Sequence, residues 1–160
     1  MRFKVRFVLT LLLAMAGLVA AGPAQASDAQ LRSVVKQQEK KVKSVLEDFE
    51  KTSDDIESKK DFQKVAEAAG EVRDAIQGYR KALAPVSGST ANGKKGKTKL
   101  RAALKQLDLA FAELQEFFAQ GDDATKAELE ASEKKFERKA DKGEKLEDEA
   151  LKLLGIESDD

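Results

Sequence analysis

The stretch LRAALKQLDLAFAELQEFF, Leu100 to Phe118, decides the fold class of this chain. Apolar residues recur in it at alternating spacings of four and three, which is the pattern of one buried face of an α-helix. Leu109, Ala110 and Phe117 widen that face, so this helix is predicted to contact more than one neighbour. The repeating face consists of Leu100, Leu104, Leu107, Phe111, Leu114 and Phe118.

Three other segments carry the same spacing, and no segment shows the alternation of period two that is typical of strands. The first stripe contains Leu31, Val35, Gln38, Val42, Val45, Phe49, Thr52 and Ile56. The second contains Phe62, Val65, Ala69, Val72, Ile76, Tyr79 and Leu83. The fourth stripe in chain order is weaker and contains Leu129, Ser132, Phe136, Gly143, Leu146, Ala150 and Leu153.

Proline and glycine residues mark where these helices end. Pro85 cannot continue a helical hydrogen-bond ladder, so the second helix is predicted to end there. Gly121 ends the third helix, and Gly155 fits the left-handed position that follows the last helix. Ile156 would then contact Leu151, as in a Schellman motif.

Polar residues mark where the helices begin. Ser27 with Gln30 and Ser58 with Asp61 have the spacing of a capping pair, in which side chains satisfy the first free amides. Thr98 is predicted to be the N-cap of the third helix. The four predicted helices cover roughly residues 28–57, 60–84, 98–119 and 123–154.

We therefore predict an all-α fold, an antiparallel up-down-up-down four-helix bundle. The alternative is a three-helix coiled coil in which the first two helices merge into one rod. The step from Ile56 to Phe62 is six residues instead of seven, which favours two separate helices. Residues 85–97 are predicted to form a flexible basic loop, and Asp122-Asp123 to place negative charge at the start of the fourth helix.

Residues 1–26 have the features of a secretory signal peptide. Three basic residues precede an apolar run at 7–21, and Ala24-Gln25-Ala26 gives the small-x-small cleavage pattern. The run is shorter than the ~20 apolar residues of a spanning helix, which disfavours an uncleaved membrane anchor. We predict a single exported domain at 27–160, periplasmic or extracellular, with no transmembrane segment after cleavage.

Composition excludes several classes of active site. The chain has 29 basic and 29 acidic residues and no Cys, His or Trp. Three basic residues lie in the predicted signal peptide, so 26 basic and 29 acidic residues remain, a net charge of −3. Ser-His triads, cysteine nucleophiles, haem ligation and ordinary zinc sites are excluded. We predict a protein that is not an enzyme and binds neither a cofactor nor a metal.

The sequence Gly96-Lys97-Thr98 has the ending of a phosphate-binding P-loop. A P-loop needs a glycine five residues before Gly96, where this chain has Ala91, and it follows a buried strand, which is missing here. The stretch therefore does not predict a nucleotide site.

The same stretch is rich in cations, with no acidic residue between Ala91 and Gln106. Lysines near a helix N-terminus can attract phosphate groups, and a start at Thr98 would add free amides. The alternative is a solvated loop that binds nothing specific. No aromatic residue is present to stack on bases, which disfavours nucleic acid. The candidate anion contacts are Lys94, Lys95, Lys97, Thr98, Lys99, Arg101 and Lys105.

Polar residues interrupt the first two stripes. Gln38 lies either in the core, where it could fix register, or where the stripe reaches water, and the sequence leaves both open. Thr52 is expected at the edge of the core. Tyr79 is expected to bury its ring and keep its hydroxyl at the edge.

These features predict an exported, non-catalytic interaction or structural protein of the cell envelope or extracellular space, with an unknown protein partner. One alternative is an electrostatic binder of envelope polyanions or anionic membrane surfaces through the basic cluster at 94–105. A second alternative is a holdase-like chaperone outside the cytoplasm, which rests on fold-level analogy alone.

Overall fold

A computed structural model describes residues 23–54, 58, 61–121 and 125–156, with side chains from residue 27 onward. Within these ranges the chain forms four helices and no strand. The helices are α1 (Pro23–Asp54), α2 (Phe62–Leu83), α3 (Ala91–Ala119) and α4 (Lys126–Leu154). The predicted all-α class is confirmed.

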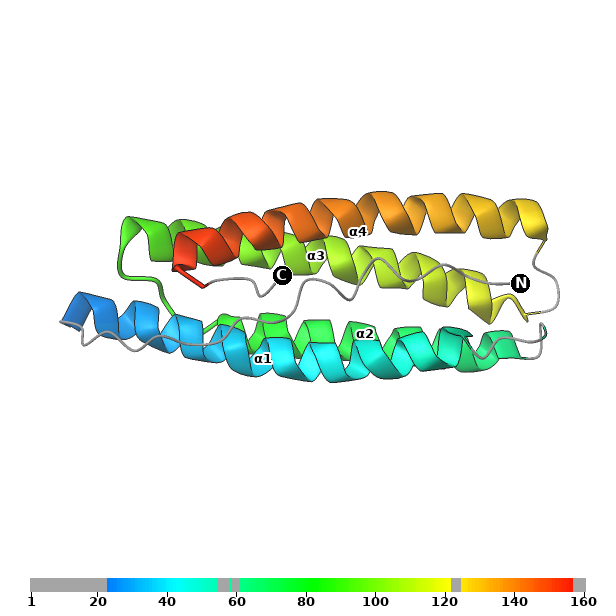
Figure 1. Ribbon diagram of the computed structural model, residues 1–160, viewed down its shortest axis with the longest axis horizontal. Helices are drawn as coiled ribbons and strands as arrows, with labels where there is room; N and C mark the ends of the chain where they lie inside the picture. Colours follow the sequence, from blue (N-terminus) through cyan, green and yellow to red (C-terminus); the bar gives the residue numbers. More distant parts are fainter. Residues whose placement is uncertain (1–22, 55–57, 59–60, 122–124, 157–160) are drawn as a thin grey trace.

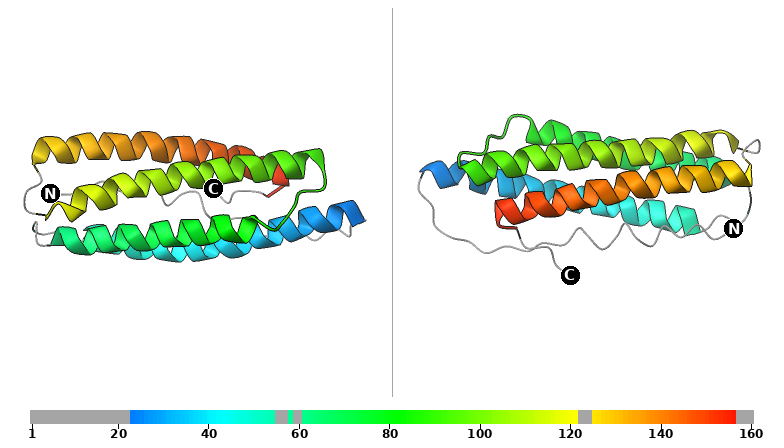
Figure 2. Two further views of the ribbon diagram at one scale, coloured as in Figure 1. Left: turned by 180° about the vertical axis from the view of Figure 1, so that it is seen from behind. Right: turned by 90° about the horizontal axis from the view of Figure 1, so that it is seen from above.

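Each helix packs against its neighbour in the sequence, α1 on α2, α2 on α3 and α3 on α4. Successive helices run in opposite directions along one long axis, and the views from behind and from above agree (Figures 1 and 2). The molecule is therefore an elongated up-down-up-down bundle, as predicted. The alternative of a single rod formed by the first two helices is wrong, because α1 and α2 lie side by side.

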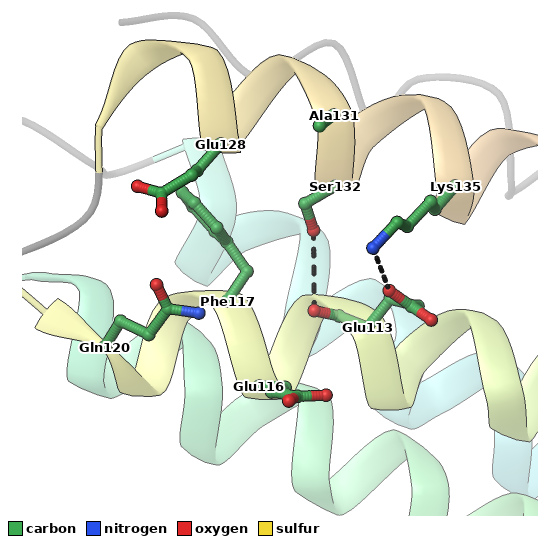
Figure 3. A pocket seen from close by; sticks show the side chains of 8 residues that line it. All are labelled: Glu113, Glu116, Phe117, Gln120, Glu128, Ala131, Ser132 and Lys135. Atoms are coloured by element: carbon green, nitrogen blue, oxygen red, sulfur yellow. Dashed lines mark hydrogen bonds and ion pairs between the residues drawn. The ribbon is translucent and has the colours of Figure 1, made fainter.

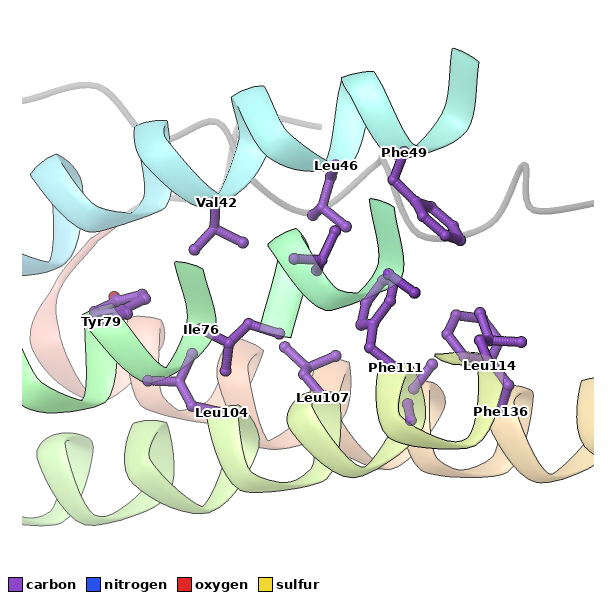
Figure 4. Close-up of a cluster of buried hydrophobic side chains, with 14 of the residues drawn as sticks. Val42, Leu46, Phe49, Ile76, Tyr79, Leu104, Leu107, Phe111, Leu114 and Phe136 are labelled. Carbon is purple, nitrogen blue, oxygen red and sulfur yellow. The ribbon is translucent and has the colours of Figure 1, made fainter. Parts of the chain in front are cut away.

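Aromatic rings tie the distant helices of this bundle together. Phe111 of α3 contacts Phe49 of α1 edge to face, with ring centroids 5.3 Å apart, and Phe136 of α4, with centroids 5.4 Å apart. Figure 4 shows Phe111 between these rings, beside Leu107 and Leu114. Such edge-to-face pairs stabilise a core beyond their buried area by about 0.5–1.5 kcal/mol each.

The predicted stripes of α2 and α3 are buried in full. In α1, Leu46 and Ser53 are buried where the predicted stripe has Val45 and Thr52. A straight α-helix drifts relative to a strict seven-residue repeat, which accounts for this shift of one position. Ile56 lies outside the described residues.

The α4 stripe shifts in the same way, so that Glu147 and Leu154 are buried while Leu146 and Leu153 are half-buried. Gln38, whose position the sequence left open, is buried at 9% exposure.

The predicted loop at 85–97 is wrong in its second half, because α3 already begins at Ala91. Its N-cap is Thr90, whose hydroxyl accepts from the Gly93 amide at 3.0 Å. Thr98 lies inside the helix, and its hydroxyl donates to the Lys94 carbonyl at 3.0 Å. The connection between α2 and α3 is therefore only residues 84–90.

Several other boundaries follow the prediction. Gly121 and Gly155 have positive φ values of 62° and 63°. The Ile156 amide donates to the Leu151 carbonyl at 3.0 Å, which is the predicted Schellman bond. The predicted capping pair is only half formed, because Asp61 accepts from the Ser58 amide at 3.1 Å but is itself the N-cap of α2 and makes no side-chain capping bond to that helix.

Two helix starts differ from the prediction. Helix α1 begins at Pro23, so Ser27 and Gln30 lie within it and do not cap it. Helix α4 begins after Thr125, which forms a capping box with Glu128. The predicted start at Asp122-Asp123 lies outside the described residues.

Candidate functional site

The predicted basic cluster lies on a regular helix instead of a loop. Lys94, Thr98, Arg101 and Lys105 are exposed and follow each other at spacings of four, three and four, so they share one face of α3. At 1.5 Å per residue this row is about 16 Å long. Lys95 is exposed beside it. The helix therefore holds these cations in a fixed row.

Two of the predicted contacts are engaged within the bundle. The Lys97 ammonium donates to the carbonyl oxygens of Ala84, at 3.0 Å, and Val86, and so caps the end of α2. Lys99 forms an ion pair with Glu149 of α4. Both lysines hold neighbouring helices together, which is a structural use that the sequence analysis missed.

The other four cations, Lys94, Lys95, Arg101 and Lys105, form no ion pair with any residue that the structure describes. Lys94 and Lys95 also lie close to the positive end of the α3 dipole, where cations are unfavourable. We call these four residues the basic row. They are exposed and unpaired, and two of them stand where the helix disfavours positive charge.

The buried residue Asp28 of α1 lies at the N-terminal end of α3. Its carboxylate accepts from the Ser89 amide at 2.7 Å, from the Ser89 hydroxyl at 3.3 Å and from the Thr90 hydroxyl. Burial raises the pKa of Asp28, but the hydrogen bonds from Thr90 and Ser89 outweigh burial and lower its pKa overall. An external anion therefore has no free helix N-terminus here, and the expected amides at Thr98 are inside the helix.

The bundle carries opposite charge at its two ends. The half that contains the α2–α3 connection comprises residues 28–43, 73–83, 91–106 and 141–154, with 17 basic and 8 acidic residues. The other half comprises 44–54, 61–72, 107–119 and 126–140, with 7 basic and 14 acidic residues. The basic row therefore belongs to a positive end of the molecule, although the chain as a whole is balanced.

A shallow cleft opens between the C-terminal half of α3 and the N-terminal half of α4 (Figure 3). It encloses about 190 Å³, and ligand pockets of small molecules usually start near ~300 Å³. Lys135 forms an ion pair with Glu113 across it at 3.5 Å, and the Ser132 hydroxyl donates to the Glu113 carbonyl at 3.4 Å. The Lys139 ammonium lowers the pKa of Glu113 by hydrogen bonding to its carboxylate. The pKa of Glu128 in the same lining is also lowered, so the two shifted carboxyl groups are held in the ionised form instead of being poised as acids or bases near neutral pH.

Sites for metals or membranes are not apparent in the described part of the chain. Residues 27–54, 58, 61–121 and 125–156 contain no group of three or more acidic, His or Cys side chains placed to hold a metal ion. Among the same residues, no helix is long and apolar enough to cross a membrane.

A second group of functional candidates lies inside the bundle and was missed from the sequence. Glu39 of α1 and Glu147 of α4 are only 3% and 4% exposed, and the Tyr79 ring and hydroxyl of α2 are 1% exposed. The expectation that the Tyr79 hydroxyl reaches the edge is therefore wrong. The signal was present in the spacing, since Glu147 lies four residues after Gly143 and three before Ala150, both on the predicted stripe.

The chain matches no family model, no curated protein and no solved structure. The proposals that follow therefore rest on the contacts, burial and charges of its own residues.

Proposed function

We propose that the protein is a non-catalytic interaction protein of the cell envelope or extracellular space, and that its basic row binds an anionic phospholipid surface. The observation that supports this proposal is the row itself, four exposed cations on a rigid helix without ion-pair partners among the described residues. A structural role does not account for them, whereas Lys97 and Lys99 have one.

A membrane surface fits this arrangement better than a single polymer strand. The cations stand on an exposed part of α3, and further basic residues of α1 and α2 lie at the same end of the bundle. The cleft between α3 and α4 is lined by residues from Glu113 to Lys135 and so lies away from this row. Binding without insertion also fits, since Leu109 is the one large hydrophobic side chain exposed in the described part of the molecule.

The expected affinity is modest. Each Lys or Arg near an anionic membrane contributes about 1 kcal/mol, so four contribute about 4 kcal/mol. That free energy corresponds to a dissociation constant of about 1 mM for the row alone. The interaction should weaken when the screening length falls from about 10 Å to a few ångströms at high salt.

Co-sedimentation with vesicles of phosphatidylglycerol and phosphatidylcholine tests this proposal. The full chain should bind at low salt and dissociate at high salt, and vesicles of phosphatidylcholine alone should not bind. Replacing all four residues of the basic row by Gln should abolish binding. The matched control removes four exposed cations from α4 by the same replacement. The control residues are Lys134, Arg138, Lys142 and Lys145.

Equal loss of binding in both variants would reduce the proposal to a general charge effect. Unchanged binding in the basic-row variant would refute it. Release of the vesicles by stoichiometric soluble polyphosphate would assign the row to phosphate polymers instead of a membrane.

The holdase alternative gains no support from the described surface. A holdase needs exposed apolar area for unfolded chains, and this surface offers Leu109 at 40% exposure. An enzymatic function likewise gains no support, because the cleft between α3 and α4 is small and its Glu113 carboxylate is paired with Lys135 and Lys139.

A further inference from the structure

Two carboxyl groups lie in the core without a counter-ion. Glu39 and Glu147 are nearly fully buried, and neither forms an ion pair with a described residue. The Oε1 atom of Glu39 and the hydroxyl of Tyr79 are buried without a hydrogen-bond partner in the described structure. A buried polar atom without a partner costs about 1–3 kcal/mol, so such a group calls for an explanation.

The three residues come from three different helices and form one polar layer. Glu39 lies between Val35 and Val42 on the buried face of α1, and Tyr79 lies on the buried face of α2 beside Val42 (Figure 4). Glu147 lies on the face of α4 that packs against α3. The charge of Glu39 acts on Glu147, and both carboxylates act on Tyr79, so the three groups lie within electrostatic range of one another.

The charges around the layer favour protonation. Burial, together with the nearby negative charges of Glu39, Asp148 and Glu144, raises the pKa of Glu147 to about 8. Burial raises the pKa of Glu39 to about 7, against the opposing charge of Lys36 on the same helix.

The other two helices add no compensating charge. Helix α2 contributes Tyr79, whose own pKa is raised well above 10 by burial and by both carboxylates. The nearby buried residues of α3 are apolar, Leu100, Ala103 and Leu104.

We propose that Glu39 and Glu147 form a proton-binding site between the first and last helices, in which bound protons hold the bundle closed and their release to solvent loosens α1 from α4. A protonated carboxyl carries no charge, so its burial costs less free energy than the burial of a carboxylate without a counter-ion. When both carboxyl groups are ionised, two like charges face each other in a medium of low dielectric constant. Among the described residues, Glu39 and Glu147 do not belong to any group of three or more acidic side chains placed to hold a metal ion.

Few other groups of this protein change charge in the pH range of this site. The chain has no His and no Cys, so near neutral pH only buried carboxyl groups and the terminal amine can change charge. The folded pKa values, about 7 and about 8, lie above the ordinary value of 4.5, so the folded state binds more protons than the unfolded state between these limits. Stability is therefore greatest below about pH 5, falls as the pH rises through 7 and 8, and then levels off.

Equilibrium unfolding of the full chain in urea between about pH 5.5 and 8.5 tests the proposal. The unfolding equilibrium constant of the natural protein should rise with pH, by up to about tenfold per pH unit for each extra proton bound. In the double variant Glu39→Gln with Glu147→Gln, which imitates the protonated groups, the constant should stay flat. Glu137→Gln, at an exposed position of α4, should keep the natural pH dependence.

A distance measurement separates loosening of α1 and α4 from general destabilisation. Because the chain has no Cys, spin labels can be placed on Lys40→Cys and Lys145→Cys, exposed positions of α1 and α4 near the site. The label distance should grow or broaden from pH 6 to pH 9 and stay constant in the double Gln variant. A control pair between α3 and α4, Lys105→Cys with Lys142→Cys, should not change.

Three results would overturn the proposal. The first is a flat unfolding constant of the natural protein over this range. The second is a double Gln variant that is helical at pH 6 and retains the natural pH dependence. The third is stabilisation at pH 8.5 by calcium or magnesium that the double variant loses, since this would assign the carboxylates to a metal ion.

Discussion

Two glycines in the middle of helices give opposite predictions for the same substitution. Gly78 in α2 is exposed, and a Cβ atom built on it meets nothing within 4 Å. Gly96 in α3 is buried, and its Cβ would lie 2.8 Å from the Leu154 Cγ and 3.2 Å from the Ala150 carbonyl oxygen. The first substitution therefore reports helix propensity alone, while the second also reports the close packing of α3 on α4.

The magnitudes follow from these two contributions. Replacing Gly by Ala in a helix interior stabilises by about 0.8–1 kcal/mol, so Gly78→Ala should stabilise the protein by that amount. Gly96→Ala gains the same propensity but overpacks the core, which costs about 1–3 kcal/mol, because the backbone of Ala150 cannot move away as a flexible side chain can. We expect Gly96→Ala to destabilise the protein by up to about 2 kcal/mol.

Thermal unfolding followed by helical circular dichroism measures both effects. For a chain of this size 1 kcal/mol shifts Tm by about 2–4 °C, so Tm should rise by about 3 °C for Gly78→Ala and fall for Gly96→Ala. Combining Gly96→Ala with Leu154→Ala should show favourable coupling, because the truncated leucine makes room for the new methyl group. If Gly96→Ala raises Tm as much as Gly78→Ala, the close approach of α3 and α4 is refuted.

Three further substitutions test the contacts around the helix ends. Asp28→Ala removes a charged acceptor from the α2–α3 connection and should destabilise by about 2–3 kcal/mol in urea unfolding. Because the pKa of Asp28 is lowered, its contribution exists above pH 3.8 and is lost as the pH falls, so an acid titration of the variant should lack that part of the loss. Lys97→Met keeps the apolar stem but removes the cap of α2, and it should cost about 1–2 kcal/mol, whereas Lys95→Met should be neutral. Thr125→Ala should cost about 1 kcal/mol and speed hydrogen exchange in the first turn of α4, and unchanged exchange there would contradict its capping role.

The helices with continuous apolar stripes could be predicted from the sequence. Apolar residues at alternating spacings of four and three, sustained over a long segment, indicate one buried face of a helix. The start of α3 could not be predicted in this way. Its first turns contain Gly93 and Gly96, which have low helix propensity and suggest a loop. The reason for these glycines is tertiary, since a Cβ at Gly93 would lie 2.2 Å from the Asp28 carboxylate, and one at Gly96 would strike Leu154.

The candidate sites were predictable to different degrees. The cations at 94–105 were found by composition, but only contacts with Val86 and Glu149 distinguish Lys97 and Lys99 from the basic row. Glu39 and Glu147 were missed because a charged residue is normally assigned to the surface. Whether a charged residue is buried depends on which positions of the helix face the core. Because a straight helix drifts relative to a seven-residue repeat, Glu147 faces the core where Leu146 was predicted to do so.

The neighbour-to-neighbour arrangement of the helices has a consequence for how the chain folds. Each helix meets its main partner across one connection, so the native contacts are local in sequence and topologies of this kind fold within microseconds to milliseconds. No Cys is present, so folding requires no oxidation step. A chain that crosses a membrane unfolded, as the proposed signal peptide would require, could therefore complete its structure as each helical hairpin emerges.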